Sequence, residues 1–321
     1  MKKRGLQRAA GFLLTAALLC SAAAPARAVW VEVPPVTLAR AVRDCVRPIF
    51  KAVRRAASPS PISTSKWTDI PVFAHAMGTV DGRIGTNCED AFWEGYARGQ
   101  RVFEVDLQLT SDGVMVARHD WGPNSNHNME QNLDGVVDWK TFMSTPVCYY
   151  YSPLDIDGII ALLQACPDAY IVTDGKDKDE DSVRAQMREI VRAVDQAEDP
   201  TLWDQIIIQI YHEEMHDWVR EEAPVKNWIF TLYQLGSLDY HQIGRFCRER
   251  NIPVVTMDAT LVSAETSRIL RSYGCLVYAH TVNRLTDMID LSWQTDGYYS
   301  DCITPSQLMG VLPGRYQQAS R

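Results

Sequence analysis

The chain has 321 residues, of which 46% are hydrophobic and 22% charged, so it can form one large globular domain or two small ones. Its formal net charge is −8 at pH 7, and five of its basic residues lie within the first 28 positions. Without those five charges the net charge becomes −13. A chain this acidic lacks the positive surface that phosphate backbones require, so we expect no nucleic-acid partner.

Residues 1–28 have the three parts of a secretory signal peptide. A basic start, MKKRGLQR, precedes an uncharged apolar run, and the small residues of Ala26-Arg27-Ala28 form a cleavage pattern. We therefore predict an exported protein, either secreted, periplasmic or held at the cell surface. The alternative is a membrane anchor formed by residues 9–26, because the uncharged run is just long enough to span a bilayer.

Residues 29–69 are predicted to form an N-terminal helix and a linker. Within them, residues 36–57 combine an apolar stripe at helical spacing with six basic residues around it, and Pro48 should kink the helix. This segment is either a packing or linker helix or a contact with an anionic membrane surface. Ser58–Trp67, SPSPISTSKW, has the composition of a linker.

From residue 70 onward, apolar strand patterns alternate with amphipathic helix patterns. Strands are predicted at 71–75, 101–107, 114–119, 169–174, 206–211, 227–233, 253–257, 275–281 and 297–301. Helices are predicted at 88–99, 156–166, 181–197, 213–223, 238–250, 263–273 and 285–294.

This alternation predicts a parallel sheet covered by helices. About eight such units in about 250 residues fit a closed TIM-type (β/α)8 barrel, so we predict a single α/β barrel domain over residues 70–321. The turn TSDG, Thr110–Gly113, joins two of the nine strand segments without a helix. One strand of that pair should therefore be an arm of a hairpin.

A TIM-type barrel carries its active site at the carboxyl ends of its strands, and polar residues recur there. They are His75, Glu104, Asp106, His119, Asp174, Lys176, Tyr211, His212, Tyr233, Gln234, Asp258, His280, Asn283 and Asp301.

Glu104 and Asp106 stand two residues apart on one strand, so their side chains point to the same face. Two buried carboxylates need a partner, and a hard cation such as Mg²⁺ or Ca²⁺ accepts carboxylate oxygens. Asp174 can supply a third oxygen, and Lys176 can neutralise a bound anion.

Two histidines, His75 and His119, end strands on either side of these acids. One histidine can remove a proton from a nucleophile while the other donates a proton to a leaving oxygen. A metal ion, a lysine and two histidines around an anion suit displacement at phosphorus.

The same residues resemble the glycerophosphodiester phosphodiesterases, which belong to the larger group of phospholipase C-like phosphodiesterase barrels. The similar segments are HAMG (75–78), GTNCEDAF (85–92), EVD (104–106), TSDG (110–113), HD (119–120), YIVTDGK (170–176), AHTVN (279–283) and DGYYSDCITP (296–305). In the family, Trp-Thr-Val-Asn corresponds to His280–Asn283. The resemblance covers roughly residues 70–305.

The resemblance implies a metal-dependent phosphoric diester hydrolase that acts on a small-molecule or lipid-derived phosphodiester. The most direct expectation is cleavage of glycerophosphodiesters to glycerol 3-phosphate and an alcohol, as a step of lipid metabolism. It implies Glu104, Asp106 and Asp174 as metal ligands and His75 and His119 as the acid–base pair. Lys176 would contact the substrate phosphate.

The chain departs from the family pattern at three places. Ala76 replaces a phosphate-binding arginine, Gly85-Thr86 replaces Pro-Glu, and Asp174 replaces a glutamate. Arg83 or Arg118 could take over the role of the missing arginine, which lysine does not reproduce. A Glu/Asp/Asp ligand set is also similar to that of phospholipase D-type enzymes (sphingomyelinase D). Two alternatives therefore stand beside the first expectation: a sphingomyelinase D-like lipid phosphodiesterase, and a non-catalytic barrel that binds phosphodiesters or lipid headgroups.

HEEMH, His212–His216, matches the zinc-protease pattern H-E-x-x-H. A zinc protease needs both histidines inside one helix and a third ligand downstream. His212 directly follows a strand, and no clear third ligand follows, so we interpret this segment as the start of a helix.

Overall fold

The computed structural model describes residues 66–122, 131 and 133–314. The expected signal peptide, the basic helix at 36–57 and the linker up to residue 65 lie outside them. None of the described helices is both long and apolar enough to cross a bilayer.

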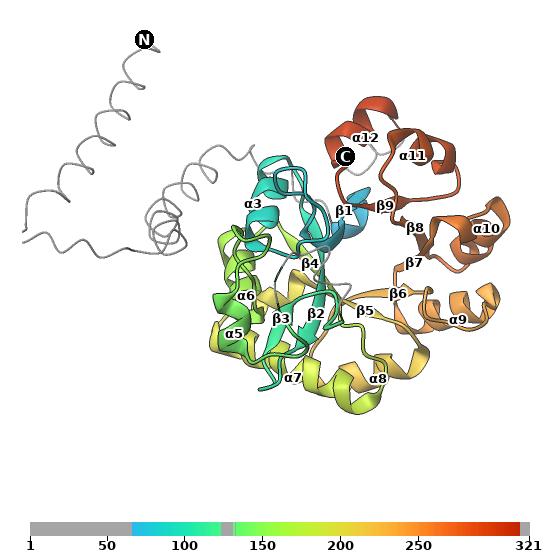
Figure 1. The fold of residues 1–321 in the computed structure, drawn as a ribbon. Helices are drawn as coiled ribbons and strands as arrows, with labels where there is room; N and C mark the ends of the chain where they lie inside the picture. Colours follow the sequence, from blue (N-terminus) through green and yellow to red (C-terminus); the bar gives the residue numbers. More distant parts are fainter. Residues whose placement is uncertain (1–65, 123–130, 132, 315–321) are drawn as a thin grey trace, which may run out of the picture. The chain divides into compact units, whose positions relative to one another are not determined.

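Eight parallel strands form the closed barrel that the sequence predicts (Figure 1). Each strand pairs in parallel with the next along the ring, and β1 closes the ring by pairing with both β2 and β9. The strands are β1 Val72–Ala74, β2 Val102–Leu109, β4 Tyr170–Asp174, β5 Ile206–Ile210, β6 Asn227–Thr231, β7 Val254–Asp258, β8 Leu276–His280 and β9 Gly297–Ser300.

The ninth strand, β3 (Met115–Ala117), is the expected hairpin arm. It runs antiparallel to β2, with Leu107 opposite Ala117, and takes no part in the parallel ring. Thr110 and Asp112 stabilise the turn, because the Thr110 hydroxyl donates to the Asp112 carboxylate and to the carbonyl of Val114. The hairpin brings the residues that follow β3 back toward the carboxyl half of β2, where the backbone N–H of Arg118 donates to the carbonyl of Asp106.

Helices surround the strands (Figure 1). The α-helices are α3 Glu89–Ala97, α5 Trp139–Ser144, α6 Ile156–Ala165, α7 Glu180–Gln196, α8 Glu213–Glu222, α9 Tyr240–Arg250, α10 Ala264–Ser272, α11 Leu285–Leu291 and α12 Pro305–Val311. Short 3₁₀ turns are η1 Trp67–Asp69, η2 His75–Met77, η3 Pro200–Asp204 and η4 Ala259–Leu261. The seven predicted helices are confirmed. The sequence patterns did not predict α5 and α12, which have six and seven residues and are therefore too short for a clear amphipathic period.

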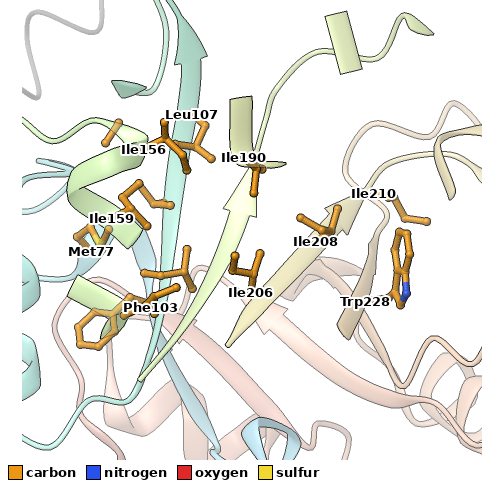
Figure 2. Close-up of a cluster of buried hydrophobic side chains, with 14 of the residues drawn as sticks. Met77, Phe103, Leu107, Ile156, Ile159, Ile190, Ile206, Ile208, Ile210 and Trp228 are labelled. Carbon is orange, nitrogen blue, oxygen red and sulfur yellow. The ribbon is translucent and has the colours of Figure 1, made fainter. Parts of the chain in front are cut away.

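Two hydrophobic layers hold the barrel together. The larger one lies between the strands and the helices, and Figure 2 shows part of it, with Phe103 and Leu107 of β2 near Ile156 and Ile159 of α6. The smaller one consists of Trp67, Phe73, Val102, Val172, Ile207, Ile229, Val254, Tyr278 and Tyr299. Its strand residues alternate with the outward-facing ones, so this layer fills the barrel interior.

The interior layer determines where polar side chains can lie. Because side chains alternate between faces, the residue two positions after an inward-facing residue also faces inward. Val102 is thus followed on the same face by Glu104 and Asp106, Val172 by Asp174, and Tyr278 by His280. Polar groups therefore begin where the apolar layer ends, at the carboxyl ends of the strands.

Candidate active site

A cavity of about 220 Å³ opens above the apolar layer of the barrel. Residues from seven of the barrel strands or the loops that follow them contribute to it, which is the arrangement expected of a barrel active site. Its lining consists of His75, Glu104, Asp174, Lys176, Gln209, Thr231, Tyr233, His280 and Tyr299.

The three acids predicted as metal ligands are brought together. One carboxylate oxygen from each of Glu104, Asp106 and Asp174 lies within 4.8 Å of the other two, and all three residues are buried. The backbone N–H of Ala76 donates to Glu104 Oε2 at 2.7 Å, and the Asn87 amide donates to Asp106 Oδ2 at 2.7 Å. Adjacent parallel strands explain the placement, because Asp106 of β2 pairs in register with Asp174 of β4.

The surroundings of Glu104 fit those of a metal ligand. Its Oε1 atom is buried without a hydrogen-bond partner among the described residues. Burial, together with the nearby negative charge of Asp106, raises the pKa of Glu104 to about 8. A buried oxygen that protein groups leave unpaired, beside two further carboxylates, fits a hard divalent ion such as Mg²⁺ or Ca²⁺.

Lys176 lies among these acids and forms ion pairs with two of them. Its ammonium is 2.6 Å from Asp106 Oδ1 and also contacts Asp174 Oδ2. Burial alone would raise the pKa of Asp106, but the positive charge of Lys176 outweighs it and holds that pKa below its usual range. The predicted site lysine thus reaches the site and carries part of the positive charge that the acid cluster requires.

Two tyrosines orient Asp174. The hydroxyls of Tyr211 and Tyr233 both donate to Asp174 Oδ1, the second at 3.2 Å. Tyr211 follows β5 and is fully buried, and its ring meets that of Tyr233 edge-on at 5.6 Å. Asp174 is shorter than the glutamate it replaces in the family pattern, and these hydroxyls fix where its carboxylate lies.

His75 directly follows β1 and is held by a chain of hydrogen bonds. Its Nδ1 is 2.7 Å from Asp301 Oδ1, and Asn283 donates to Asp301 Oδ2 at 2.5 Å. Its Nε2 lies 3.9 Å from Glu104 Oε2, on the cavity side. Burial opposes protonation of the ring, but the charge of Glu104 and the bond to Asp301 outweigh it and raise the pKa of His75 to about 9. This geometry suits a proton-transfer residue whose ring orientation is fixed.

His119 stands farther out than the other predicted site residues. It follows β3, its Nδ1 is 2.6 Å from Asp120 Oδ2, and 54% of its side chain is exposed. It does not line the cavity, although its charge acts on Asp106. The structure therefore brings His75, Glu104, Asp106, Asp174 and Lys176 together and places His119 outside the cavity.

Neither arginine suggested as a replacement for the missing one lines the cavity. Arg118 is buried, and its guanidinium donates to the carbonyl of Asp120 at 2.7 Å and to Gln131 at 2.9 Å. Arg83 lies on the exposed loop after η2. Positive charge in the cavity lining therefore comes from Lys176 and His75.

Three residues that received no role from the sequence patterns contribute to the site. Asp301 orients His75, Asn283 holds Asp301, and His280 lines the cavity. All three stand at strand ends, and their position is the signal that could have identified them.

The segment HEEMH does not form a metal site in the described structure. His212 precedes α8 and its Nε2 is 2.9 Å from the carbonyl of Lys178, whereas His216 is buried against Trp228. The acid cluster above is the group of potential metal ligands found among the described residues. The interpretation of this segment as a helix start is confirmed.

The closed (β/α)8 barrel of this chain resembles solved structures of phosphodiesterases. A glycerophosphodiester phosphodiesterase from Parabacteroides distasonis aligns with a TM-score of 0.61 and 14% identity, over 77% of this chain and 98% of the other. An Oleispira antarctica phosphodiesterase, solved with the product sn-glycerol-3-phosphate, aligns with a TM-score of 0.61 and 14% identity, over 75% and 96%. The glycerophosphodiester phosphodiesterase of Thermotoga maritima aligns with a TM-score of 0.55 and 15% identity, over 76% of this chain and 98% of the other.

The chain therefore has the fold of the glycerophosphodiester phosphodiesterases, as its sequence motifs predict. No protein-family model and no curated protein sequence matches it.

Proposed function

We propose that this protein is a metal-dependent phosphodiesterase that hydrolyses glycerophosphodiesters to glycerol 3-phosphate and an alcohol. The observation that carries the proposal is the buried cluster of Glu104, Asp106 and Asp174 beside a histidine that a carboxylate orients, all at one cavity. The likeness in fold to phosphodiesterases, one of them solved with glycerol 3-phosphate, supports the same choice.

The three carboxylates would hold a Mg²⁺ or Ca²⁺ ion, which supplies charge stabilisation at the phosphoryl oxygens when bound. Glu104 offers the unpartnered Oε1, Asp106 is fixed by Asn87, and Asp174 is fixed by two tyrosine hydroxyls. Lys176 holds positive charge beside the same acids and can contact an anionic substrate at the cavity wall.

His75 is the proton-transfer group that the cavity geometry supports best. Its Nε2 faces the cavity, so in its neutral form the ring can take the proton of the attacking water or of a neighbouring substrate hydroxyl. A cation held beside Glu104 would favour that neutral form, because it would offset the negative charge that raises the pKa of His75 to about 9.

With water as the nucleophile, a P–O bond forms to the water oxygen and the P–O bond to the leaving alcohol breaks, which gives glycerol 3-phosphate. With the substrate hydroxyl as the nucleophile, the same exchange gives a cyclic phosphodiester, and attack by water then opens the ring to the phosphate monoester. The leaving oxygen needs a proton, and we assign its donation to His119, whose hairpin lies over the carboxyl half of β2.

A panel of phosphodiesters tests the proposal. Glycerophosphocholine, glycerophosphoinositol, lysophospholipid and sphingomyelin are each incubated with the protein, with EDTA, and with Mg²⁺ or Ca²⁺ added back. We expect release of an alcohol from the glycerophosphodiesters that stops with EDTA and returns with metal. Cleavage of sphingomyelin or lysophospholipid alone would favour the sphingomyelinase D-like alternative, and binding without cleavage of any diester would favour the non-catalytic one.

We also propose that the protein is exported, on the sequence of residues 1–28. N-terminal sequencing of the protein from the cells that make it tests this, with Val29 expected as the first residue. A retained apolar run at 9–26 would support the anchor instead. Contact of residues 36–57 with anionic membranes is tested by sedimentation with vesicles that contain anionic lipid.

A further inference from the structure

His280 is a cavity residue that the mechanism above leaves without a role. It is the last residue of β8, on the same inward face as Tyr278 of the apolar layer. Its Nε2 atom is buried and has no hydrogen-bond partner among the described residues. Leaving a buried polar atom unpaired costs free energy, so such an atom on a cavity wall points to a ligand.

Aromatic rings fix the orientation of this imidazole. The ring of Tyr233 meets it edge-on with centroids 5.8 Å apart and 81° between planes, and the ring of Tyr299 does so at 6.4 Å and 77°. Both tyrosines also line the cavity. His280 is therefore held by packing, and its Nε2 is left free of the protein's own hydrogen bonds.

The acid cluster does not include His280. Glu104, Asp106 and Asp174 form a group of potential ligand atoms within 4.8 Å of one another, and neither ring nitrogen of His280 belongs to it. His280 is therefore not needed to complete the acid cluster, and it lines the same cavity with an Nε2 atom that has no partner among the described residues.

The other donors of the lining are largely engaged. Lys176 contacts Asp106 and Asp174, the Tyr233 hydroxyl donates to Asp174, and His75 Nδ1 is bound to Asp301. Thr231 Oγ1, like His280 Nε2, is buried and has no partner among the described residues. Unused donors on a wall beside a cation site match a ligand with anionic oxygens.

We propose that His280 Nε2–H donates a hydrogen bond to a non-bridging oxygen of the substrate phosphate and so takes over part of the role of the arginine that Ala76 replaces. This rests on the proposed function for the identity of the ligand as a phosphate ester. Burial lowers the pKa of His280, which leaves the ring neutral near pH 7. A neutral ring binds the phosphate without adding charge that would repel the metal ion. The family resemblance places tryptophan at this position, so the contact distinguishes this chain from the family pattern.

Binding is tested with imidazole ¹H–¹⁵N spectra of the full protein, loaded with Mg²⁺ and titrated with inorganic phosphate or sn-glycerol 3-phosphate. The chain has seven histidines, and loss of one signal in His280→Ala assigns the resonance. We expect both phosphates to shift the His280 signals and free glycerol to leave them unchanged. If glycerol shifts them as phosphate does, or if neither phosphate does, the proposed contact is wrong.

Steady-state kinetics and binding measurements provide a second test of the proposed contact. His280→Ala should raise KM for the cleaved diester and weaken glycerol 3-phosphate binding by roughly 10- to 100-fold, with a smaller change in kcat, as for a lost hydrogen bond to a charged group. His280→Gln, whose amide can donate in the same place, should recover most of the affinity. The exposed His241→Ala serves as the matched control.

Two further measurements separate the possible failures. The His280→Ala variant should bind Mg²⁺ with the wild-type affinity and unfold at the wild-type midpoint. If this variant also binds glycerol 3-phosphate with the wild-type affinity, the inference is wrong. If the protein cleaves no diester of the panel yet binds phosphate through His280, the proposed hydrolysis fails while this contact stands.

Discussion

The imidazole of His75 and the carboxylate of Asp301 are 226 positions apart in the sequence, yet they form a hydrogen bond in which Nδ1 and Oδ1 are 2.7 Å apart. Barrel closure produces this pair. Ala74, the last residue of β1, is in register with Ser300, the last residue of β9, so the next residue of each strand arrives at the same place. The hydrogen bond orients the ring so that Nε2 faces the cavity.

The first prediction concerns this hydrogen bond. Asp301→Asn should lower kcat/KM for phosphodiester hydrolysis by roughly 10- to 100-fold, because the ring loses its charged partner. The pKa of His75 should fall, since Asp301 contributes to raising it to about 9. Steady-state kinetics and the imidazole NMR titration measure the two effects.

Asp258→Asn is the matched control for that variant. Asp258 also ends a barrel strand, but it is exposed and accepts hydrogen bonds from Thr260 instead of a site residue. Equal losses of activity in the two variants would contradict a specific role for Asp301.

The second prediction concerns stability without metal. Glu104→Gln should make the EDTA-treated protein more stable, because the amide keeps an oxygen for the N–H of Ala76 and removes a buried charge beside Asp106. The pKa of Glu104 is raised to about 8, so wild-type stability falls as pH rises from about 4.5 to 8. The free energy of unfolding of Glu104→Gln, relative to that of the wild type, should therefore increase between about pH 4.5 and pH 8, to the order of a few kcal/mol, and stay constant above pH 8.

Urea unfolding at pH 5, 7 and 9 with EDTA measures this advantage, and the exposed Glu214→Gln provides the control. The same Glu104 variant should lose metal binding and most hydrolysis. A variant that is less stable than the wild type at pH 9 would contradict the assigned charge state.

The third prediction concerns protons released on metal binding. A metal ion needs ionised Glu104, so below pH 8 its binding must displace the proton held there. Apparent affinity for Mg²⁺ or Ca²⁺ should rise by up to tenfold per pH unit between pH 6 and 8 and then level off. Calorimetry at pH 6.5 in buffers of different ionisation enthalpy counts the protons, and a count of zero would contradict a protonated Glu104.

The strands and the acid cluster could be predicted because they follow from local periodicity. Glu104 and Asp106 share a face at a spacing of two, and their strand end defines the barrel mouth. The partners of these groups could not be predicted in the same way. The bond of Asp301 to His75 depends on closure between the first and last strands, and no local pattern encodes that register.

Side-chain conformation set a second limit. The spacing of Lys176 and Asp174 indicated that both reach the site, but the sequence did not show that Lys176 would pair with the acids. In the same way, the position of His119 after a strand indicated the barrel mouth. Its exposure depends on the geometry of the hairpin and on its contact with Asp120.

The last prediction tests whether the two histidines act as an acid–base pair. His75→Ala should lower kcat by roughly 10²- to 10⁴-fold, the range expected for loss of a general acid or base. If His119 protonates the leaving alcohol, His119→Ala should cause a comparable loss for a poor leaving group such as choline. The loss should be much smaller for a p-nitrophenyl diester, whose leaving oxygen needs no proton.

His241→Ala is the control, because this exposed histidine lies outside the cavity and contacts Tyr273. A loss that is equal for both substrates would show that His119 does not act on the leaving group. Hydrolysis that survives both substitutions would mean that the acid–base pair lies elsewhere in the site. His75 and His119 differ in burial, so a loss confined to His75→Ala would leave the buried, carboxylate-bonded ring as the group that carries the proton transfer.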